Sequence, residues 1–269
     1  MIIGNKPPHT NLINAGWINR QAIEYGFREI KKDMTTFDLM KKVESFVYNM
    51  GGLPSFKGFL GFPGSCCISL NDEVVHGYPD NTMIRDGDFV TIDCGTEFVG
   101  DNTDQFHSYF VDAADTRRIF FDELKHIPDK VQEMWLMTDV KNWLDEVINI
   151  IKPGTSLYEI ANAFDQLACN KKHTKFFPQF YGHGIGTATH EEPGIAHTLI
   201  GLPDYEVERL KNTYLVEGQL ICLEPSATLG STETIKDKDG WTESTKDGSI
   251  AVHVEHTVLV TKFGALVIS

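Results

Sequence analysis

The sequence has no long apolar run, no leader-like start and no excess of basic residues. No segment approaches the roughly 18–20 consecutive apolar residues that cross a membrane, so we expect no membrane span. The first residues include Pro7 and Pro8 and lack an apolar core, so we expect no secretory signal. Lysine and arginine number 24 against 38 acidic residues, which gives a net charge of −14. Because nucleic-acid binding relies on basic side chains, this balance argues against a nucleic acid as the substrate.

Cysteine is scarce and odd in number. There are five cysteines, and Cys66 and Cys67 are adjacent. This usage favours reduced thiols in a cytoplasmic protein over a framework of disulfides. The 269 residues are enough to bury a sizeable core, and no low-complexity linker divides them.

The hydrophobic pattern predicts helices and strands in both halves of the chain. Helices are expected over 11–32, after a cap at Thr35 and Thr36, over 119–151 and again after residues 155–156. Strands are expected over 66–70, 89–94 and 106–111, and again from residue 220 to the end. The turn signal at 99–102 places Asp93 and Asp104 on the two arms of one hairpin.

Two short segments echo each other. Residues 87–93 read GDFVTID and residues 218–224 read GQLICLE, so each runs from a glycine through apolar residues to an acid. Each segment follows a region that contains a capped amphipathic helix. The echo indicates two related α/β halves around a pseudo-twofold axis.

Four acids lie in or beside apolar strand segments. They are Asp93, Asp104, Glu224 and Glu255. Any one of them alone reads as an outward-facing acid on a half-exposed strand. Together they indicate a shared site, because buried carboxylates need partners and oxygen ligands suit divalent cations. Two cations about 3.5–4 Å apart would offset the repulsion among the acids and activate a shared water molecule.

His183 is the best imidazole candidate. It lies in the segment GHGIG, where small neighbours leave room for a metal and a substrate, although a lone histidine is more often structural. The segment lacks the lysine and serine of a phosphate-binding loop. The segment HEEPG at 190–194 lacks the second histidine of the HExxH zinc motif. His76 precedes a turn and reads by itself as an ordinary loop histidine.

These segments together resemble the type I methionine aminopeptidases, which are metallopeptidases with the pita-bread fold. The resemblance runs from about residue 35 to the C-terminus. It is carried by the segments 67–71, 73–79, 87–93, 100–104, 182–186, 190–193, 223–225, 240–242, 245–247 and 255–257.

The resemblance implies an α/β fold with two pseudo-symmetric halves around a central antiparallel sheet and helices outside. On this basis we expect a helical N-terminal extension over 1–34 and a single catalytic domain over 35–269. Two divalent ions, which could be cobalt, manganese, iron or zinc, would share five ligands. Asp93 would bind one ion, Asp104 and Glu255 would bridge both, and His183 and Glu224 would complete the shell of the other.

The family resemblance also implies a mechanism and a substrate pocket. A hydroxide bridging the two metals would attack the first peptide bond, Glu224 would shuttle the proton, His190 would stabilise the oxyanion and His76 would hold the scissile amide. The methionine side chain would lie among Phe56, Phe59, Phe62, Cys67 and Trp241. The three-residue spacing of the phenylalanines also fits plain packing on one face of a helix.

The expected activity is removal of the N-terminal methionine from nascent chains and peptides with a small second residue. Two alternatives remain, a proline-directed aminopeptidase or dipeptidase of the same fold and a non-catalytic binding module. Thr189, Val75 and longer connections on both sides of His183 depart from the family pattern, which leaves substrate preference open. We expect a cytoplasmic monomer, with the ribosome as a candidate partner.

Overall fold

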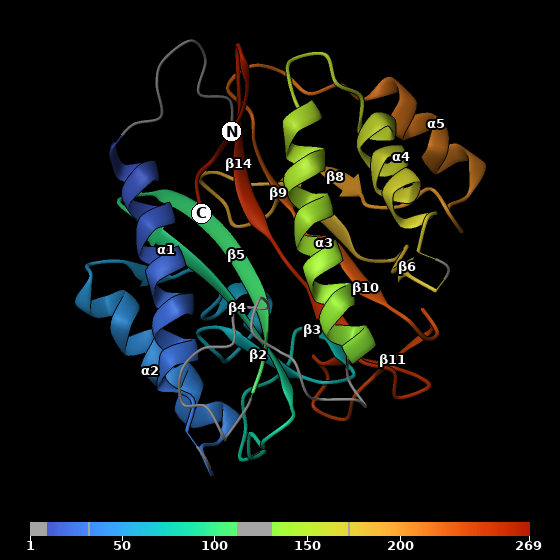
Figure 1. Cartoon of the computed structure of the whole chain (residues 1–269). Helices are drawn as coiled ribbons and strands as arrows, with labels where there is room; N and C mark the ends of the chain where they lie inside the picture. Colours follow the sequence, from blue (N-terminus) through green and yellow to red (C-terminus); the bar gives the residue numbers. More distant parts are fainter. Residues whose placement is uncertain (1–9, 32, 112–130, 172) are drawn as a thin grey trace.

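The computed structural model describes residues 10–31, 33–111, 131–171 and 173–269. The first part of the helix expected over 119–151 lies outside the described residues. Strands in the described part pair antiparallel throughout, and helices pack beside them (Figure 1). This is the mixed α/β architecture that the sequence predicts.

The first half combines two helices with an antiparallel sheet. Helix α2 begins after the cap at Thr35, whose hydroxyl oxygen accepts a hydrogen bond from the backbone N–H of Asp38, as predicted. The sheet has the order β1-β4-β2, and β5 pairs with β4. The elements are α1 (Thr10–Glu29), α2 (Thr36–Asn49), β1 (Leu53–Pro54), the 3₁₀ turn η1 (Phe59–Gly61), β2 (Cys67–Leu70), β3 (Glu73–Val75), β4 (Phe89–Phe98) and β5 (Asp101–Phe110).

In its described residues, the second half holds three helices and the remaining strands. Its largest sheet has the order β15-β14-β9-β7-β8, and a three-stranded sheet has the order β13-β10-β6. A further sheet, β11-β12-β3, joins strands of both halves. Helix α5 was not predicted, because few of its nine residues are apolar and only Leu210 is buried. The elements are α3 (Val131–Ile150), α4 (Leu157–Ala168), β6 (Lys175–Phe176), β7 (Tyr181–Gly184), β8 (Glu191–Ala196), α5 (Asp204–Asn212), β9 (Leu220–Leu223), β10 (Ser226–Thr228), β11 (Thr234–Lys236), β12 (Glu243–Thr245), β13 (Ala251–His253), β14 (His256–Thr261) and β15 (Gly264–Val267).

The β4–β5 hairpin is longer than the pattern predicted. Its turn consists of Val99 and Gly100, which have φ values of 52° and 88°. Two consecutive residues with positive φ form the tight turn that lets both strands pair up to the turn itself. Strand β5 therefore begins at Asp101 instead of residue 106, and Asp104 lies inside the strand. Helix α1 ends at Glu29 rather than at residue 32.

The internal echo has a structural counterpart. Gly87 and Gly218 precede β4 and β9 with φ values of 82° and 85°. Each donates its backbone N–H over 2.8 Å to a distant carbonyl, Val111 for Gly87 and Val260 for Gly218. The backbone therefore has the same conformation and the same kind of hydrogen bond just before each strand. Figure 1 shows helices flanking each half. Both strands point an acid toward the region between the halves.

The core has a main cluster in each half. Helix α1 contributes Ile18, Ala22 and Ile23 to the first cluster, where Val90 and Ile92 of β4 also lie. Helices α3 and α4 supply much of the second cluster. The boundary drawn at residue 34 stays a prediction, although α1 shares its core with the following elements. None of the helices in the described ranges is both long and apolar enough to cross a membrane.

Candidate metal centre and pocket

One cavity of about 440 Å³ brings together all of the predicted site residues. It lies where strands of the two halves meet. Leu60, Val75 and Phe106 also line it and were not predicted. The lining residues are Phe56, Phe59, Leu60, Phe62, Cys67, Val75, His76, Asp93, Asp104, Phe106, His183, His190, Glu224, Trp241 and Glu255.

The hairpin of the first half supplies two carboxylates. Asp93 on β4 is paired with Cys67 on β2, and Asp104 on β5 is paired with Gly95 on β4. Gly95 leaves space for the pocket wall, because a Cβ at this position would come within 2.6 Å of the Phe56 ring. The hairpin register therefore places one acid on each arm, as the sequence predicts.

Strands of the second half supply the remaining acids and the histidine. His183 on β7 is paired with Cys222 on β9, and Glu224 directly follows β9. Glu255 lies between β13 and β14, and its backbone N–H donates to the Phe106 carbonyl over 3.0 Å. The contact joins Glu255 to β5 and thus to the first half.

The potential ligand atoms form two overlapping groups. Those of Asp93, Asp104 and Glu255 lie within 4.8 Å of one another, and so do those of His183, Cys222 and Glu255. Glu255, which is 1% exposed, is common to both groups. Glu255 therefore joins the two groups of candidate ligand atoms.

His183 is oriented as a metal ligand would be. Its Nδ1 lies 2.8 Å from the carbonyl oxygen of Gly184, so Nδ1 carries the proton. Its Nε2 is therefore a lone-pair donor, and it lies 3.4 Å from Oε1 of Glu224. A backbone carbonyl that fixes the tautomer is the usual support of a ligating histidine. A cation would stabilise the two facing acceptors.

Four carboxylate oxygens in the cavity are buried without a hydrogen-bond partner in the structure. They belong to Asp93, Asp104, Glu224 and Glu255. Burial raises the pKa of Asp104 to about 7, and burial with the charge of Asp104 raises the pKa of the other three. Acids crowded in this way are stable as anions only beside cations. The residues present therefore fit divalent metal ions.

Cys222 lies in the cluster but was not predicted to be there. Burial and the charge of Glu255 raise the pKa of its thiol, and the sulfur lies 3.6 Å from Oγ1 of Thr257. A neutral thiol is a poor ligand, so Glu224 suits the cation better. Its place in the cluster could have been predicted from the strand pattern. Cys222 and Glu224 are two residues apart, and residues two apart in a strand lie on the same face.

Two further histidines line the cavity beside the carboxylates. The ring centroids of His183 and His190 are 3.9 Å apart, and Phe59 stacks on His190 at 5.0 Å. Desolvation within the cavity lowers the pKa of both His76 and His190, which favours the neutral imidazole of each. His76 has a φ of 59°, a strained conformation of the kind found at functional sites.

The aromatic residues form one wall of the cavity. Phe56, Phe62 and Cys67 are buried together, and the Phe62 ring meets Trp241 edge-on at 5.2 Å. Phe56, Phe59 and Phe62 lie in a loop and not on one face of a helix, which their three-residue spacing would also have fitted. The backbone cannot continue as a helix there, because Gly58 and Gly61 have φ values of 84° and 89°. Their part in substrate binding stays a prediction.

His197 is a supporting residue that the sequence reasoning missed. Its Nε2 accepts a hydrogen bond from the backbone N–H of Glu224 over 3.1 Å, and burial lowers its pKa to about 3. Gly182 makes room beside it, since a Cβ there would come within 2.3 Å of the Cys222 carbonyl. A histidine directly after a short strand gives no sequence signal for this role.

Comparison with known proteins gives a family and a set of relatives. Residues 10–262 match the model of metallopeptidase family M24. Methionine aminopeptidase 1 of Bacillus subtilis (strain 168) is 31% identical over 265 residues, covering 98% of this chain and 97% of the relative. The methionine aminopeptidase of Aquifex aeolicus (strain VF5) is 33% identical over 262 residues, covering 95% and 93%.

Solved structures share the fold. The methionine aminopeptidase of Thermotoga maritima superposes with a TM-score of 0.83 at 27% identity and covers 100% of this chain and 99% of its own. The prolidase of Pyrococcus furiosus has a TM-score of 0.68 at 20% identity and covers 96% of this chain and 62% of its own. The prolidase likeness therefore concerns the fold alone.

Proposed function

The chain belongs to metallopeptidase family M24 and, within it, to the methionine aminopeptidases, and we propose that it removes the N-terminal methionine from peptides and nascent proteins with a small second residue. Family membership rests on the match over residues 10–262 and on full-length relatives above 30% identity. The pita-bread arrangement expected from the sequence agrees with the solved structures that resemble it.

One observation carries the proposal. Four unpaired buried carboxylate oxygens and the free Nε2 of His183 face the same cavity as an apolar aromatic wall. The polar end suits cations that bind the free amine and the first carbonyl of a peptide, and the apolar end suits a side chain without charge. A binding module would have no need of the acids, whose burial costs free energy.

We assign the five polar positions to two divalent ions. Asp93 would bind one ion, Asp104 and Glu255 would bridge both, and His183 and Glu224 would complete the second. When bound, the ions would polarise the scissile carbonyl and lower the pKa of a water molecule toward about 7. Cobalt, manganese, iron and zinc all remain candidates.

The chain itself would orient the substrate and move protons. Glu224 would take a proton from the attacking water at its carboxylate and pass it to the leaving amine. His190, neutral through burial, would donate a hydrogen bond to the developing negative charge on the carbonyl oxygen. His76, which also lines the cavity, would hold the scissile amide.

The aromatic wall would bind the methionine side chain. Phe56, Phe59 and Phe62 with Cys67 and Trp241 offer ring edges and a polarisable sulfur. Each sulfur–aromatic contact contributes about 0.3–1.5 kcal/mol. Thr189 is buried beside His190 and Val75 lines the cavity, so both bear on the shape available to other side chains.

The proposal extends to a cytoplasmic monomer. Its support is chemical, since all five cysteines are free, with four of them buried. A reducing compartment keeps such thiols from pairing. Contact with the ribosome stays a prediction.

A peptide panel tests the proposal. Purified protein supplied with Mn²⁺ or Co²⁺ should release methionine from Met-Ala-Ser and leave Met-Leu-Ser intact. A peptide with proline in the second position and no N-terminal methionine tests the proline-directed alternative. Preferred cleavage of that peptide would overturn the assignment, and release of no residue from any peptide would favour a binding module.

A further inference from the structure

The loop that carries the aromatic wall has little backbone anchorage. This aromatic loop, residues 55–65, joins β1 to β2 and carries Phe56, Phe59 and Phe62. The backbone N–H groups of residues 58, 59, 61 and 62 all bond to carbonyls of residues 56, 58, 59 or 62. These hydrogen bonds shape the loop internally, and the backbone tie to the sheet is at the start of the loop, where the N–H of Ser55 donates to the Gly95 carbonyl over 3.0 Å.

The tip of the aromatic loop stands in solvent. Leu60 is 83% exposed and has a φ of 48°. A Cβ placed on Gly58 or Gly61 would meet nothing within 4 Å. The tip itself is therefore open at Leu60 and the two glycines, while Phe59 stacks on His190 and Phe62 meets Trp241. Contacts at the ends of the loop add to this positioning.

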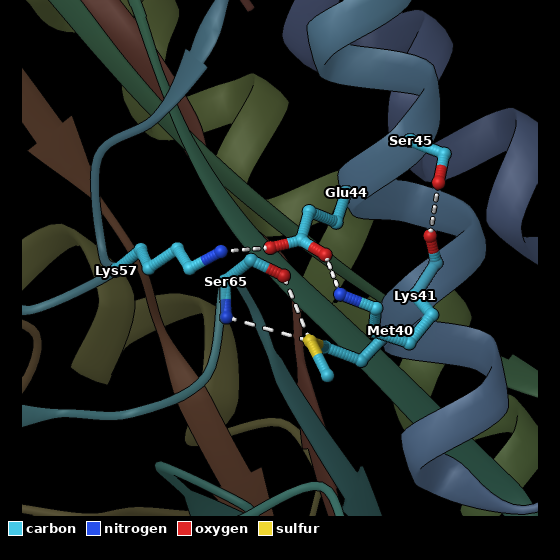
Figure 2. Close-up of polar contacts among 6 residues, drawn as sticks. All are labelled: Met40, Lys41, Glu44, Ser45, Lys57 and Ser65. Atoms are coloured by element: carbon cyan, nitrogen blue, oxygen red, sulfur yellow. Dashed lines mark hydrogen bonds and ion pairs between the residues drawn. The ribbon is translucent and has the colours of Figure 1, made fainter.

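Helix α2 contacts both ends of the loop. Glu44 accepts a hydrogen bond over 2.5 Å from Nζ of Lys57, the residue after Phe56 (Figure 2). The sulfur of Met40, one turn earlier, accepts a hydrogen bond over 2.8 Å from the hydroxyl of Ser65. Figure 2 shows the two contacts side by side, so one helix face holds both ends of the loop.

The charge on Glu44 makes its contact with the loop strong. Its side chain is only 6% exposed, and both carboxylate oxygens are paired, one with Lys57 and one with Lys41. Burial alone would raise the pKa of Glu44, but the hydrogen bonds from the two lysines outweigh it and lower that pKa. A buried anion strongly retains its cations, because an unpaired buried charge is costly. Lys57 also lies 5.8 Å from the Tyr48 ring centroid.

We propose that Glu44 and Lys57 form a clamp that fixes the aromatic loop, which makes Glu44 a positioning residue for the selectivity of the side-chain pocket. Glu44 does not line the cavity and touches no substrate. Its hydrogen bond to Lys57 fixes the position of the adjacent Phe56, and with it the path of the loop that carries Phe59 and Phe62. The inference rests on the proposed function, because the pocket is taken to bind the methionine side chain.

Steady-state kinetics on Met-Ala-Ser test the clamp. Glu44→Gln and Lys57→Met should each raise KM about tenfold, the size of one charged hydrogen bond, and leave kcat within about twofold. Lys57→Arg keeps the charge and should restore a KM close to that of the unchanged protein. Lys42→Met is the matched control, since Lys42 also lies on α2 but pairs with Glu29 of α1 instead of with the loop.

Limited proteolysis gives a readout that does not need activity. A protease that cuts after aromatic or leucine residues should cleave at Phe59 or Leu60 about tenfold faster in Glu44→Gln and Lys57→Met, but not in Lys42→Met. Lys57 is half exposed, so Lys57→Met reports on the clamp even if Glu44→Gln folds poorly.

Two outcomes would overturn the clamp. One is a KM and a cleavage rate that are unchanged in both variants, and the other is an equal change in Lys42→Met. Failure of the unchanged protein to release methionine would refute the proposed function instead, while proteolysis would still report on the loop.

Discussion

Nε2 of His183 faces Oε1 of Glu224 at 3.4 Å, inside the cavity that collects the other three carboxylates. The Gly184 carbonyl holds the imidazole proton on Nδ1, and burial favours a neutral His183 by lowering its pKa to about 3. Burial with the charges of Asp104 and Asp93 raises the pKa of Glu224. The pair is stable with Glu224 ionised only when a cation lies beside both atoms.

Substitution of Glu224 separates chemistry from folding. Glu224→Gln should lower kcat on Met-Ala-Ser by at least about 1,000-fold, because the amide can neither accept the proton nor ligate as an anion. Its unfolding temperature should stay equal or rise, since a buried acid is replaced by a neutral group. Calorimetry and peptide turnover are the measurements. Retained turnover would reject Glu224 as the proton carrier.

The carboxylates of the first half should set how many ions bind. Asp104→Asn should weaken metal binding by at least about 100-fold and reduce the bound ions per chain from two toward one. Isothermal titration with Mn²⁺ measures both quantities. Asp145→Asn on the exposed face of α3 is the control and should bind as the unchanged protein does. Equal stoichiometry in both variants would exclude Asp104 as a ligand.

His197 should matter through Glu224. His197→Phe leaves the buried N–H of Glu224 without its acceptor, which should cost about 1–3 kcal/mol of unfolding free energy and lower kcat about tenfold. His197→Gln offers an amide oxygen and should recover part of both losses. Denaturant unfolding and peptide turnover give the comparison. If Gln behaves like Phe, loss of packing rather than the hydrogen bond explains the effect.

Part of this site could be predicted from the sequence because strands have a simple period. An acid inside an apolar strand is visible as an exception, so Asp93, Glu224 and Glu255 could be identified, and the turn at Val99 and Gly100 placed Asp104 on the second arm. The family resemblance then supplied the assignment of each ligand.

Other features gave no local signal. Glu44 on a helix pairs with Lys57 in a loop, and neither sequence segment indicates which charged residue will be its partner. The hydrogen bond from Glu224 to His197 depends on how β8 and β9 align across β7, which is set by packing of the whole sheet. Helix α5 gives little sequence signal because few of its residues are apolar and only Leu210 is buried.

A partly buried histidine outside the catalytic group should make stability depend on pH. Burial, with the charges of His256 and Lys141, lowers the pKa of His107 to about 4, below its ordinary value of 6.5. The folded state therefore binds fewer protons than the unfolded state between these values. Stability from this group is complete above pH 6.5 and is lost as pH falls toward 4.

The variant His107→Phe isolates that effect. Its unfolding free energy should fall less steeply from pH 6.5 to pH 4, by up to about 1.4 kcal/mol for each pH unit. Denaturant titrations at matched pH values give the difference, and other buried histidines contribute equally to both proteins. Parallel pH profiles would show that His107 titrates normally.

Methionine release from Met-Ala-Ser during metal titration tests the metal-dependent aminopeptidase assignment most directly. After chelation the protein should release no methionine, and added Mn²⁺, Co²⁺, Fe²⁺ or Zn²⁺ should restore the rate as the site fills. An N-acetylated Met-Ala-Ser should remain intact, since it lacks the free amine. Undiminished release after chelation, or no release at full metal occupancy, would contradict the assignment.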